Sequence, residues 1–211
     1  MSLSHLGFCG IDESVDPSLL AMISHHHPYV EWGILFRDNF NSFGKARYPT
    51  FDWIQTRLRP AYQESGQKMQ LAGHLCGTYV YDIFKGDKRF VQQLQNLGFR
   101  RIQINPTMTN GVDIEFLSTI QNSIGNVVEI IKTNPSIEFI IQWTNETQEL
   151  CDLIQKHPNI SNNISFLIDP SQGTGTLIKE FPTIDTNSKV GYAGGIGPST
   201  VTQVMAQVLQ I

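Results

Sequence analysis

The sequence predicts one α/β domain of the parallel (β/α)-barrel, or TIM-barrel, type that spans residues 1–211. Short apolar runs alternate with longer stretches of helical character, each unit is about thirty residues long, and no change of composition marks a domain boundary. Strands that alternate with helices form a parallel sheet. A barrel of this type closes with eight strands. The sequence supplies seven units, so we expect the eighth to be missing or truncated. An open, doubly wound sheet is the alternative that tolerates seven strands.

The expected elements follow each other along the whole chain. The apolar runs predict strands at Leu3–Cys9, Tyr29–Phe36, Gln70–Cys76, Arg101–Asn105, Glu138–Trp143, Ser165–Asp169 and Val190–Ala193. The stretches between them predict helices at Pro17–His25, Phe51–Glu64, Arg89–Leu97, Ile114–Thr133, Glu146–Lys156, Leu177–Lys179 and Thr200–Ile211.

Residues that favour helix ends support several of these boundaries. Asp16 followed by Pro17 is typical of an N-cap and a first helical position. Thr50 and Asn145 are similar starts, and Gly98 is a typical stop.

The bulk composition bounds the cellular context and the partners. Charged residues make up 16% of the chain and the net charge is −4, which argues against a general affinity for nucleic acid or an anionic membrane. Three widely spaced cysteines do not form a disulfide framework, and we see neither a signal peptide nor an apolar run of membrane-spanning length. We therefore expect a cytoplasmic protein.

Chemistry in such barrels lies at the carboxyl ends of the strands, and polar residues gather there in this sequence. Cys9 ends the first strand, where the alternative interpretation is a small buried apolar residue. His74 and Cys76 share one face of the third strand, and Gln103 and Asn105 share one face of the fourth. These positions are typical of strands that reach a pocket.

The last two strands end in a carboxylate and in glycine-rich loops. Asp169 follows an apolar run, so it needs a partner if it is buried. Gly173 and Gly175 follow it. Gly194, Gly195 and Gly197 come just before a helix, where backbone N–H groups and the helix N-terminus favour an anion. The sequence therefore predicts a phosphate site formed by these glycines, with a tight turn as the alternative.

Taken in order, these pieces resemble the phosphoribosylanthranilate isomerase family of tryptophan biosynthesis. The resemblance runs through five segments: Cys9-Gly10-Ile11; Gly33-Ile34-Leu35-Phe36 with Arg47-Tyr48; Gln103; Leu167-Ile168-Asp169 with Gly173-Thr174-Gly175; and Ala193-Gly194-Gly195-Ile196 with Pro198. It covers nearly the whole chain. Each motif is weak alone, and the ordered set is fairly specific.

The resemblance implies an isomerase that rearranges a phosphoribosyl aromatic amine from aldose to ketose, without a cofactor or metal. It implies that Asp169 is the general acid that protonates the ribose ring oxygen and that Cys9 is the general base that removes the proton from the adjacent sugar carbon. Arg47 would lie near the substrate carboxylate, and His74, Gln103 and Asn105 would line the substrate site.

Some features depart from the family and keep other functions open. Asn105 stands where the family usually has histidine, and the eighth strand with its glycine-rich loop is not found. The main alternative is a repurposed barrel that binds a phosphorylated, sugar-type metabolite, and its open sheet edges favour a homodimer. A weaker alternative is a metal-dependent lyase that uses His74, Cys76 and Asp169. The run His25-His26-His27 follows the first helix and is given no ligand role.

Overall fold

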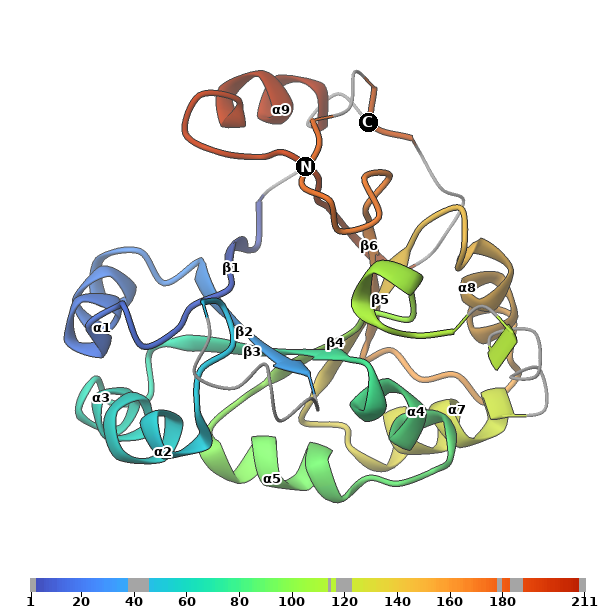
Figure 1. Cartoon of the computed structure of the whole chain (residues 1–211), viewed down its shortest axis with the longest axis horizontal. Helices are drawn as coiled ribbons and strands as arrows, with labels where there is room; N and C mark the ends of the chain where they lie inside the picture. The colour runs from blue at the N-terminus through green and yellow to red at the C-terminus, as the bar shows by residue number, and fades with distance from the viewer. Residues whose placement is uncertain are drawn as a thin grey trace.

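The computed structural model describes residues 3–37, 46–113, 115–116, 123–177, 180–182 and 188–208. Seven parallel strands form one sheet in chain order. They are β1 (Leu6–Cys9), β2 (Val30–Arg37), β3 (Gln70–Cys76), β4 (Arg101–Ile104), β5 (Glu138–Trp143), β6 (Ile164–Ile168) and β7 (Lys189–Tyr192). The strands curl around the centre of the molecule and the helices lie outside them (Figure 1). This arrangement confirms the predicted α/β fold with seven barrel-type units.

The longer helices lie between the strands in the chain and cover the outer face of the sheet, while a short 3₁₀ turn lies in the loop after β4 at the carboxyl ends of the strands. They are α1 (Pro17–His26), α2 (Phe51–Trp53), the π-helical turn η1 (Ile54–Leu58), α3 (Arg59–Glu64), α4 (Thr78–Phe84), α5 (Arg89–Leu97), the 3₁₀ turn η2 (Met108–Asn110), α7 (Ile124–Thr133), α8 (Gln148–Gln155) and α9 (Val201–Val208). The sequence missed α4, although Val80, Ile83 and Phe84 on it are buried at helical spacing.

Two predicted helix starts were right and one was wrong. The Asp16 side chain accepts a hydrogen bond from Ser18 N, and the Thr50 side chain accepts one from Trp53 N. The start expected at Asn145 is wrong, because the Thr147 hydroxyl bonds Thr144 N and Gln142 O in a turn before α8.

Three other predicted boundaries need correction or lie partly outside the described residues. The first strand begins at Leu6 rather than Leu3. The predicted helix Leu177–Lys179 is wrong at Leu177, which is not helical, and residues 178–179 lie outside the described residues. The predicted helix Ile114–Thr133 is helical at residues 115–116 and over Ile124–Thr133, and it includes the undescribed residues 114 and 117–122.

Pro60 explains the widened turn inside the predicted helix Phe51–Glu64. The helix runs over the predicted residues but adopts π geometry over Ile54–Leu58, which ends two residues before the proline. Proline has no N–H to donate, and its ring crowds the carbonyl four residues earlier. A wider turn accommodates both effects without ending the helix.

The two faces of the sheet differ in chemistry. The face toward the helices is apolar: Phe36 on β2, for example, packs its ring against Phe51, Phe90 and Phe99. The alternate residues of the same strands face the concave side, and many are polar or small. The polar residues at period two in β4 and β5 therefore lie together on the concave face.

A cluster of charged residues occupies the concave face at the N-terminal ends of the strands. Arg101 on β4 reaches across β3 to Glu31 on β2, with 2.5 Å between Nη1 and Oε2, and also contacts Glu138 on β5 at 3.3 Å. Lys189 on β7 contacts Glu138 at 3.5 Å. Side chains from four strands can meet in this way only because the sheet is curled.

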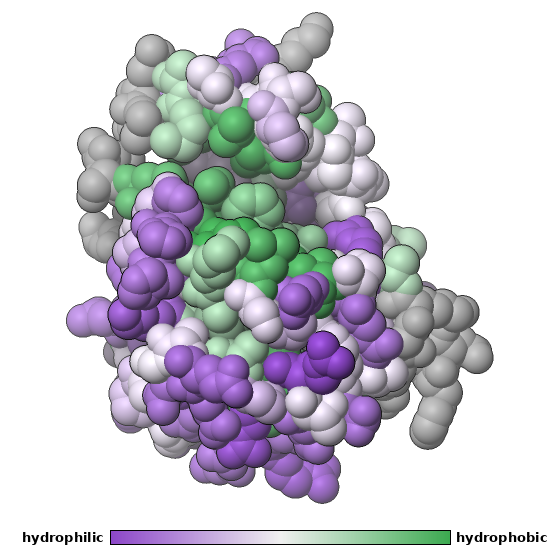
Figure 2. All heavy atoms as spheres, turned by 90° about the vertical axis from the view of Figure 1, so that its left-hand side faces the viewer, coloured by the Kyte–Doolittle hydropathy of each residue, from purple (hydrophilic) through white to green (hydrophobic). Residues whose placement is uncertain are grey.

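The two outer strands of the described sheet, β1 and β7, each pair with one neighbour only. Phe8 on β1 is 48% exposed, and Leu19 and Met22 on α1 are also exposed. Figure 2 shows hydrophobic side chains on the side of the molecule that carries β1 and α1. The homodimer through open edges stays a prediction.

In the described part of the chain, no helix has the length and apolar character needed to cross a membrane.

Candidate functional site

The parallel sheet brings most of the predicted site residues to one edge, which we call the carboxyl edge. Cys9 ends β1, His74 lies near the end of β3, and Asp169 directly follows β6. Gln103 and Asn105 lie at the end of β4. Because all the strands run in the same direction, their carboxyl ends meet at this edge whatever the distance between them in the sequence.

Cys9 lies between an imidazole and a guanidinium. Its Sγ is 3.4 Å from Nδ1 of His74 and accepts a hydrogen bond of 3.6 Å from Nη2 of Arg47. His74 comes from β3 and Arg47 from the loop after β2, so three separate segments build this group. The sequence did not predict the contact between Cys9 and His74.

The backbone around Arg47 holds its side chain over Cys9. Arg47 has a φ of +72°, and its N–H donates a 2.5 Å hydrogen bond to Oδ2 of Asp12. The hydrogen bonds from Ser14 and Arg47 lower the pKa of Asp12. A Cβ on Gly10 would lie 2.7 Å from Nε of Arg47, so the glycine after Cys9 leaves the space that the guanidinium fills.

The electrostatic environment keeps both Cys9 and His74 neutral at pH 7. Although Cys9 is exposed as a residue, enough protein surrounds its sulfur that partial loss of water raises the thiol pKa; Arg47 opposes this rise and the negative charge of Asp169 adds to it. Burial and the charges of Arg101 and Arg47 lower the pKa of His74 to about 4. Cys9 at the end of β1 and Asp169 directly after β6 both lie at the carboxyl edge.

Asp169 is buried and accepts three hydrogen bonds. Oδ2 accepts from Nε2 of Gln142 at 2.9 Å and from the N–H of Gly173 at 2.8 Å, and Oδ1 accepts from the Ser171 hydroxyl at 2.6 Å. These partners satisfy a carboxylate that is only 5% exposed. They also fix its orientation at the end of β6.

A chain of amide and thiol contacts joins β4 and the loop that follows it to Asp169. Nε2 of Gln103 donates to Oδ1 of Asn105 at 2.7 Å, and Nδ2 of Asn105 contacts Sγ of Cys76 at 3.5 Å. Cys76 in turn donates to Asn110, whose Nδ2 donates to Oε1 of Gln142 at 3.1 Å. Gln103 and Asn105 thus belong to the same polar network as Asp169.

The two glycine-rich loops pack against each other beside this network. A Cβ on Gly195, whose φ is +60°, would lie 2.2 Å from Leu177 N, and one on Gly194, whose φ is +110°, would lie 3.3 Å from Oγ of Ser171. The loops after β6 and β7 therefore meet, as a shared anion site requires.

The amides of these loops are not equally available to an anion. Gly173 N donates to Asp169, Gly175 N to Ser171, and Gly197 N to Thr200. The N–H groups of Gly194 and Gly195 donate to no group among the described residues. Phosphate binding stays a prediction for all five glycines, and among the described residues the amides of Gly194 and Gly195 have no protein acceptor that would compete with an anion.

Sequence reasoning missed three residues of the site: Asn110, Gln142 and Ser171. Gln142 carried a usable signal, because it is a polar residue at period two in the apolar strand β5, as Gln103 is in β4. Asn110 and Ser171 lie in turns, where their residue types are common.

The alternative metal site is not assembled: among the described residues no three histidine, cysteine, aspartate or glutamate side chains form a metal-binding group.

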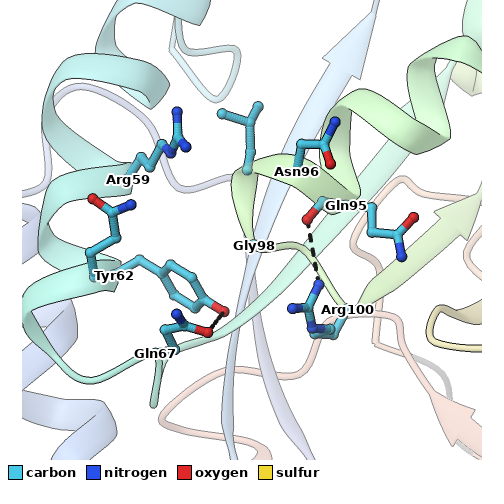
Figure 3. A pocket seen from close by; sticks show the side chains of 9 residues that line it. Arg59, Tyr62, Gln67, Gln95, Asn96, Gly98 and Arg100 are labelled. Carbon is cyan, nitrogen blue, oxygen red and sulfur yellow. Dashed lines mark hydrogen bonds between the residues drawn. The ribbon is translucent and has the colours of Figure 1, made fainter.

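Two hollows on the surface lie at the opposite end of the strands. One, of about 130 Å³, lies between α3 and α5 and includes Tyr62, Gly98 and Arg100 (Figure 3). The other, of about 360 Å³, includes Arg101, Glu138 and Lys189. Their lining residues lie at the N-terminal ends of strands or in the helix ends and loops that precede those strands. Both hollows are therefore distinct from the site that contains Cys9 and Asp169.

Fold and site together define a parallel β/α-barrel-type protein with a Cys–His–Arg group and a hydrogen-bonded carboxylate at its carboxyl edge. No protein-family model matches the chain, and no curated protein sequence matches it. The solved structures that resemble the chain in fold include two enzymes of low sequence identity. One is a mutant tryptophan synthase alpha-subunit from the hyperthermophile Pyrococcus furiosus, with 14% identity over 96% of this chain and 82% of that one, at a TM-score of 0.47.

The other is dihydrodipicolinate synthase from Agrobacterium tumefaciens, with 11% identity over 98% of this chain and 75% of that one, at a TM-score of 0.45. The fold assignment rests on the strand order and pairing of the chain itself.

Proposed function

We propose that the protein is an aldose–ketose isomerase of the phosphoribosylanthranilate isomerase type. The observation that supports this proposal is the position of Cys9 at the end of β1 and of Asp169 directly after β6, both at the carboxyl edge of the sheet. The reaction needs one acid and one base, and these two groups supply them.

The proposed chemistry proceeds in three steps. Asp169, which takes up the Cys9 thiol proton in the substrate complex, donates it to the ribose ring oxygen; the bond between that oxygen and the anomeric carbon breaks, and an iminium forms on the amine. The Cys9 thiolate then removes the proton from the adjacent carbon, and the electron pair of that C–H bond neutralises the iminium to give an enolamine. The enolamine tautomerises to the amino-ketose, so no oxidant or reductant is consumed.

The Cys9 environment suits a base that is activated by substrate. The raised thiol pKa means that the free protein holds mainly the thiol at pH 7. A cationic iminium beside Sγ would add to the effect of Arg47 and favour the thiolate. The amides of Gly194 and Gly195 would hold the substrate phosphate, and Arg47 would also pair with the substrate carboxylate.

Turnover of phosphoribosylanthranilate tests this proposal directly. We expect the wild-type protein to convert the aldose to the ketose, and we expect Cys9→Ser and Asp169→Asn each to lower kcat by about 10²- to 10⁴-fold. Asp152→Asn on α8 is a matched control that should keep wild-type turnover. Equal turnover in all four proteins would refute the assigned acid and base.

The hydrogen bonds of Asp169 favour one second candidate, a repurposed barrel that binds a phosphorylated sugar-type metabolite. Asp169 accepts hydrogen bonds from Gln142, Ser171 and Gly173. These bonds would also be expected if Asp169 only held the loop after β6 in place and took no part in catalysis. Calorimetry with ribose 5-phosphate separates the candidates. Binding without turnover of phosphoribosylanthranilate supports the repurposed barrel, and no binding at millimolar ligand counts against both.

A further inference from the structure

The sulfur of Cys9 has two nitrogen neighbours from different segments of the chain. Nδ1 of His74 lies 3.4 Å away, and Nη2 of Arg47 donates from 3.6 Å. Arg47 can only donate, whereas Nδ1 of a neutral histidine either donates or accepts according to its tautomer. The tautomer of His74 therefore decides whether its ring stabilises the thiol or the thiolate.

The contact between Cys9 and His74 depends on a glycine in the strand between them. Cys9 pairs with Gly33 of β2, while His74 pairs with Leu35, two residues further along that strand. A Cβ on Gly33 would lie 2.7 Å from Cε1 and 2.8 Å from Nε2 of His74. Because Gly33 has no side chain, the imidazole lies across β2 and reaches Cys9.

We propose that neutral His74 is a positioning residue that donates a hydrogen bond from Nδ1 to the Cys9 thiolate. Together with Arg47 it forms a two-donor site that stabilises the thiolate at the carboxyl edge. This inference rests on the proposed function in so far as Cys9 acts there as a base. No proton moves to the imidazole in this scheme, so His74 stays neutral throughout.

The charged groups around the pair are consistent with this assignment. Arg101 and Arg47 both oppose a positive charge on the imidazole, and burial adds to their effect. Arg47 favours the thiolate and Asp169 opposes it. Cys76 is the other titratable group that interacts with Cys9, and burial raises its thiol pKa to about 11, so it remains neutral. These charges favour a neutral imidazole, the form that the proposed donor role requires.

Alkylation of Cys9 by iodoacetamide as a function of pH measures how easily its thiolate forms. Mass spectrometry of the Cys9 peptide separates it from the buried Cys76 and Cys151. We expect His74→Phe, which has no donor, to react at least about tenfold more slowly at pH 7.5, the change that one pKa unit gives. We expect His74→Gln, which keeps an N–H donor, to recover most of the wild-type rate.

Gly33→Ala provides a second variant in which the histidine is intact. The added methyl group displaces the ring, so we expect Cys9 alkylation to slow as in His74→Phe. His157→Gln, after α8 and away from the carboxyl edge, is the control and should match wild type. Far-UV circular dichroism of each variant identifies any that do not fold.

The ¹⁵N NMR spectrum of His74, recorded at an alkaline pH at which Cys9 is a thiolate, gives an independent readout, since it distinguishes a protonated from a bare Nδ1. An unprotonated Nδ1, or an unchanged or faster alkylation in folded His74→Phe, would overturn the inference. Absence of isomerase turnover in the wild-type protein would refute the proposed function alone, because the alkylation profile and the tautomer are measured without substrate.

Discussion

Gln142 on β5 links Asp169 to the polar network of the neighbouring strands. Its Nε2 donates to Asp169 at 2.9 Å, while its Oε1 accepts from Asn110 at 3.1 Å. The Gln142 side chain is buried, so both of its polar ends need partners. One amide therefore orients the candidate acid and couples it to Asn110, Cys76 and Asn105.

Replacing Gln142 by leucine tests how much these hydrogen bonds contribute to the stability of the protein. Leucine removes a donor from the buried Asp169 carboxylate and an acceptor from Asn110. We expect Gln142→Leu to lower the free energy of unfolding by about 1–3 kcal/mol, the cost of leaving buried polar groups without partners. Urea unfolding followed by circular dichroism measures it. Gln148→Leu, at an exposed position of α8, is the control, and equal stability of the two variants would contradict this account.

The low pKa of His74 predicts that the protein loses stability in mild acid. The pKa is about 4 in the folded protein and about 6.5 in the unfolded chain, so the unfolded state binds more protons between these values. The free energy of unfolding therefore falls as the pH is lowered from about 7 to 4, and His74 contributes about 3 kcal/mol of this loss.

Urea unfolding at several pH values, for wild type and His74→Gln, isolates this contribution. The lowered pKa of His5 adds a loss in the same direction to both proteins, so it cancels in the comparison. We expect a shallower decline in His74→Gln. Parallel curves for the two proteins would mean that His74 titrates alike in the folded and unfolded states.

The sequence predicted the strands well because alternation of apolar and polar residues is a local signal. Gln70–Cys76 and Glu138–Trp143 have the predicted bounds, and Cys9 and Asp169 lie at the carboxyl edge because parallel strands require it. Gly98 ends α5 in a left-handed conformation, with a φ of +103°, as its residue type indicated.

The contacts across strands were not predictable in the same way. The approach of His74 to Cys9 depends on the register of three strands and on the space above Gly33. Gln142 reaches Asp169 only because β5 and β6 are neighbours. Register and curl arise from the packing of the whole sheet, so no local pattern reports them.

Gly98 offers a test of backbone geometry far from the candidate site. Its positive φ disfavours a side chain, and an added Cβ would lie 2.4 Å from the ring of Tyr62, which lines the same hollow (Figure 3). Left-handed backbone costs about 1–2 kcal/mol and overpacking about 1–3 kcal/mol. We expect Gly98→Ala to lower the free energy of unfolding by about 2 kcal/mol or more.

Gly125→Ala is the matched control for Gly98→Ala. Gly125 lies within α7, and a Cβ there would meet no atom within 4 Å. We expect this variant to gain up to about 1 kcal/mol, since alanine favours a helix. Thermal unfolding of both variants in parallel checks the two signs, and a loss of equal size in both would argue against a clash with Tyr62.

Arg101 compensates the negative charges of two carboxylates, those of Glu31 and Glu138, at the N-terminal ends of the strands. Its side chain is 15% exposed, and those of Glu31 and Glu138 are 8% and 19% exposed. Although burial opposes it, the charge of Arg101 helps to lower the pKa of Glu138. Removing the guanidinium leaves two largely buried negative charges without this partner, so we expect Arg101→Met to lower the free energy of unfolding by about 3–5 kcal/mol at pH 7.

Lys189→Met separates this effect from a general loss of charge. Lys189 also contacts Glu138, but its side chain is 69% exposed, so we expect a cost below about 1 kcal/mol. Urea unfolding at pH 7 compares the two variants. Because Arg101 helps to lower the pKa of Glu138, Glu138 takes up a proton more readily in Arg101→Met as the pH falls, so the deficit of this variant relative to wild type should shrink. A deficit that is small at pH 7, or that grows as the pH falls, would show that Arg101 does not balance these carboxylates.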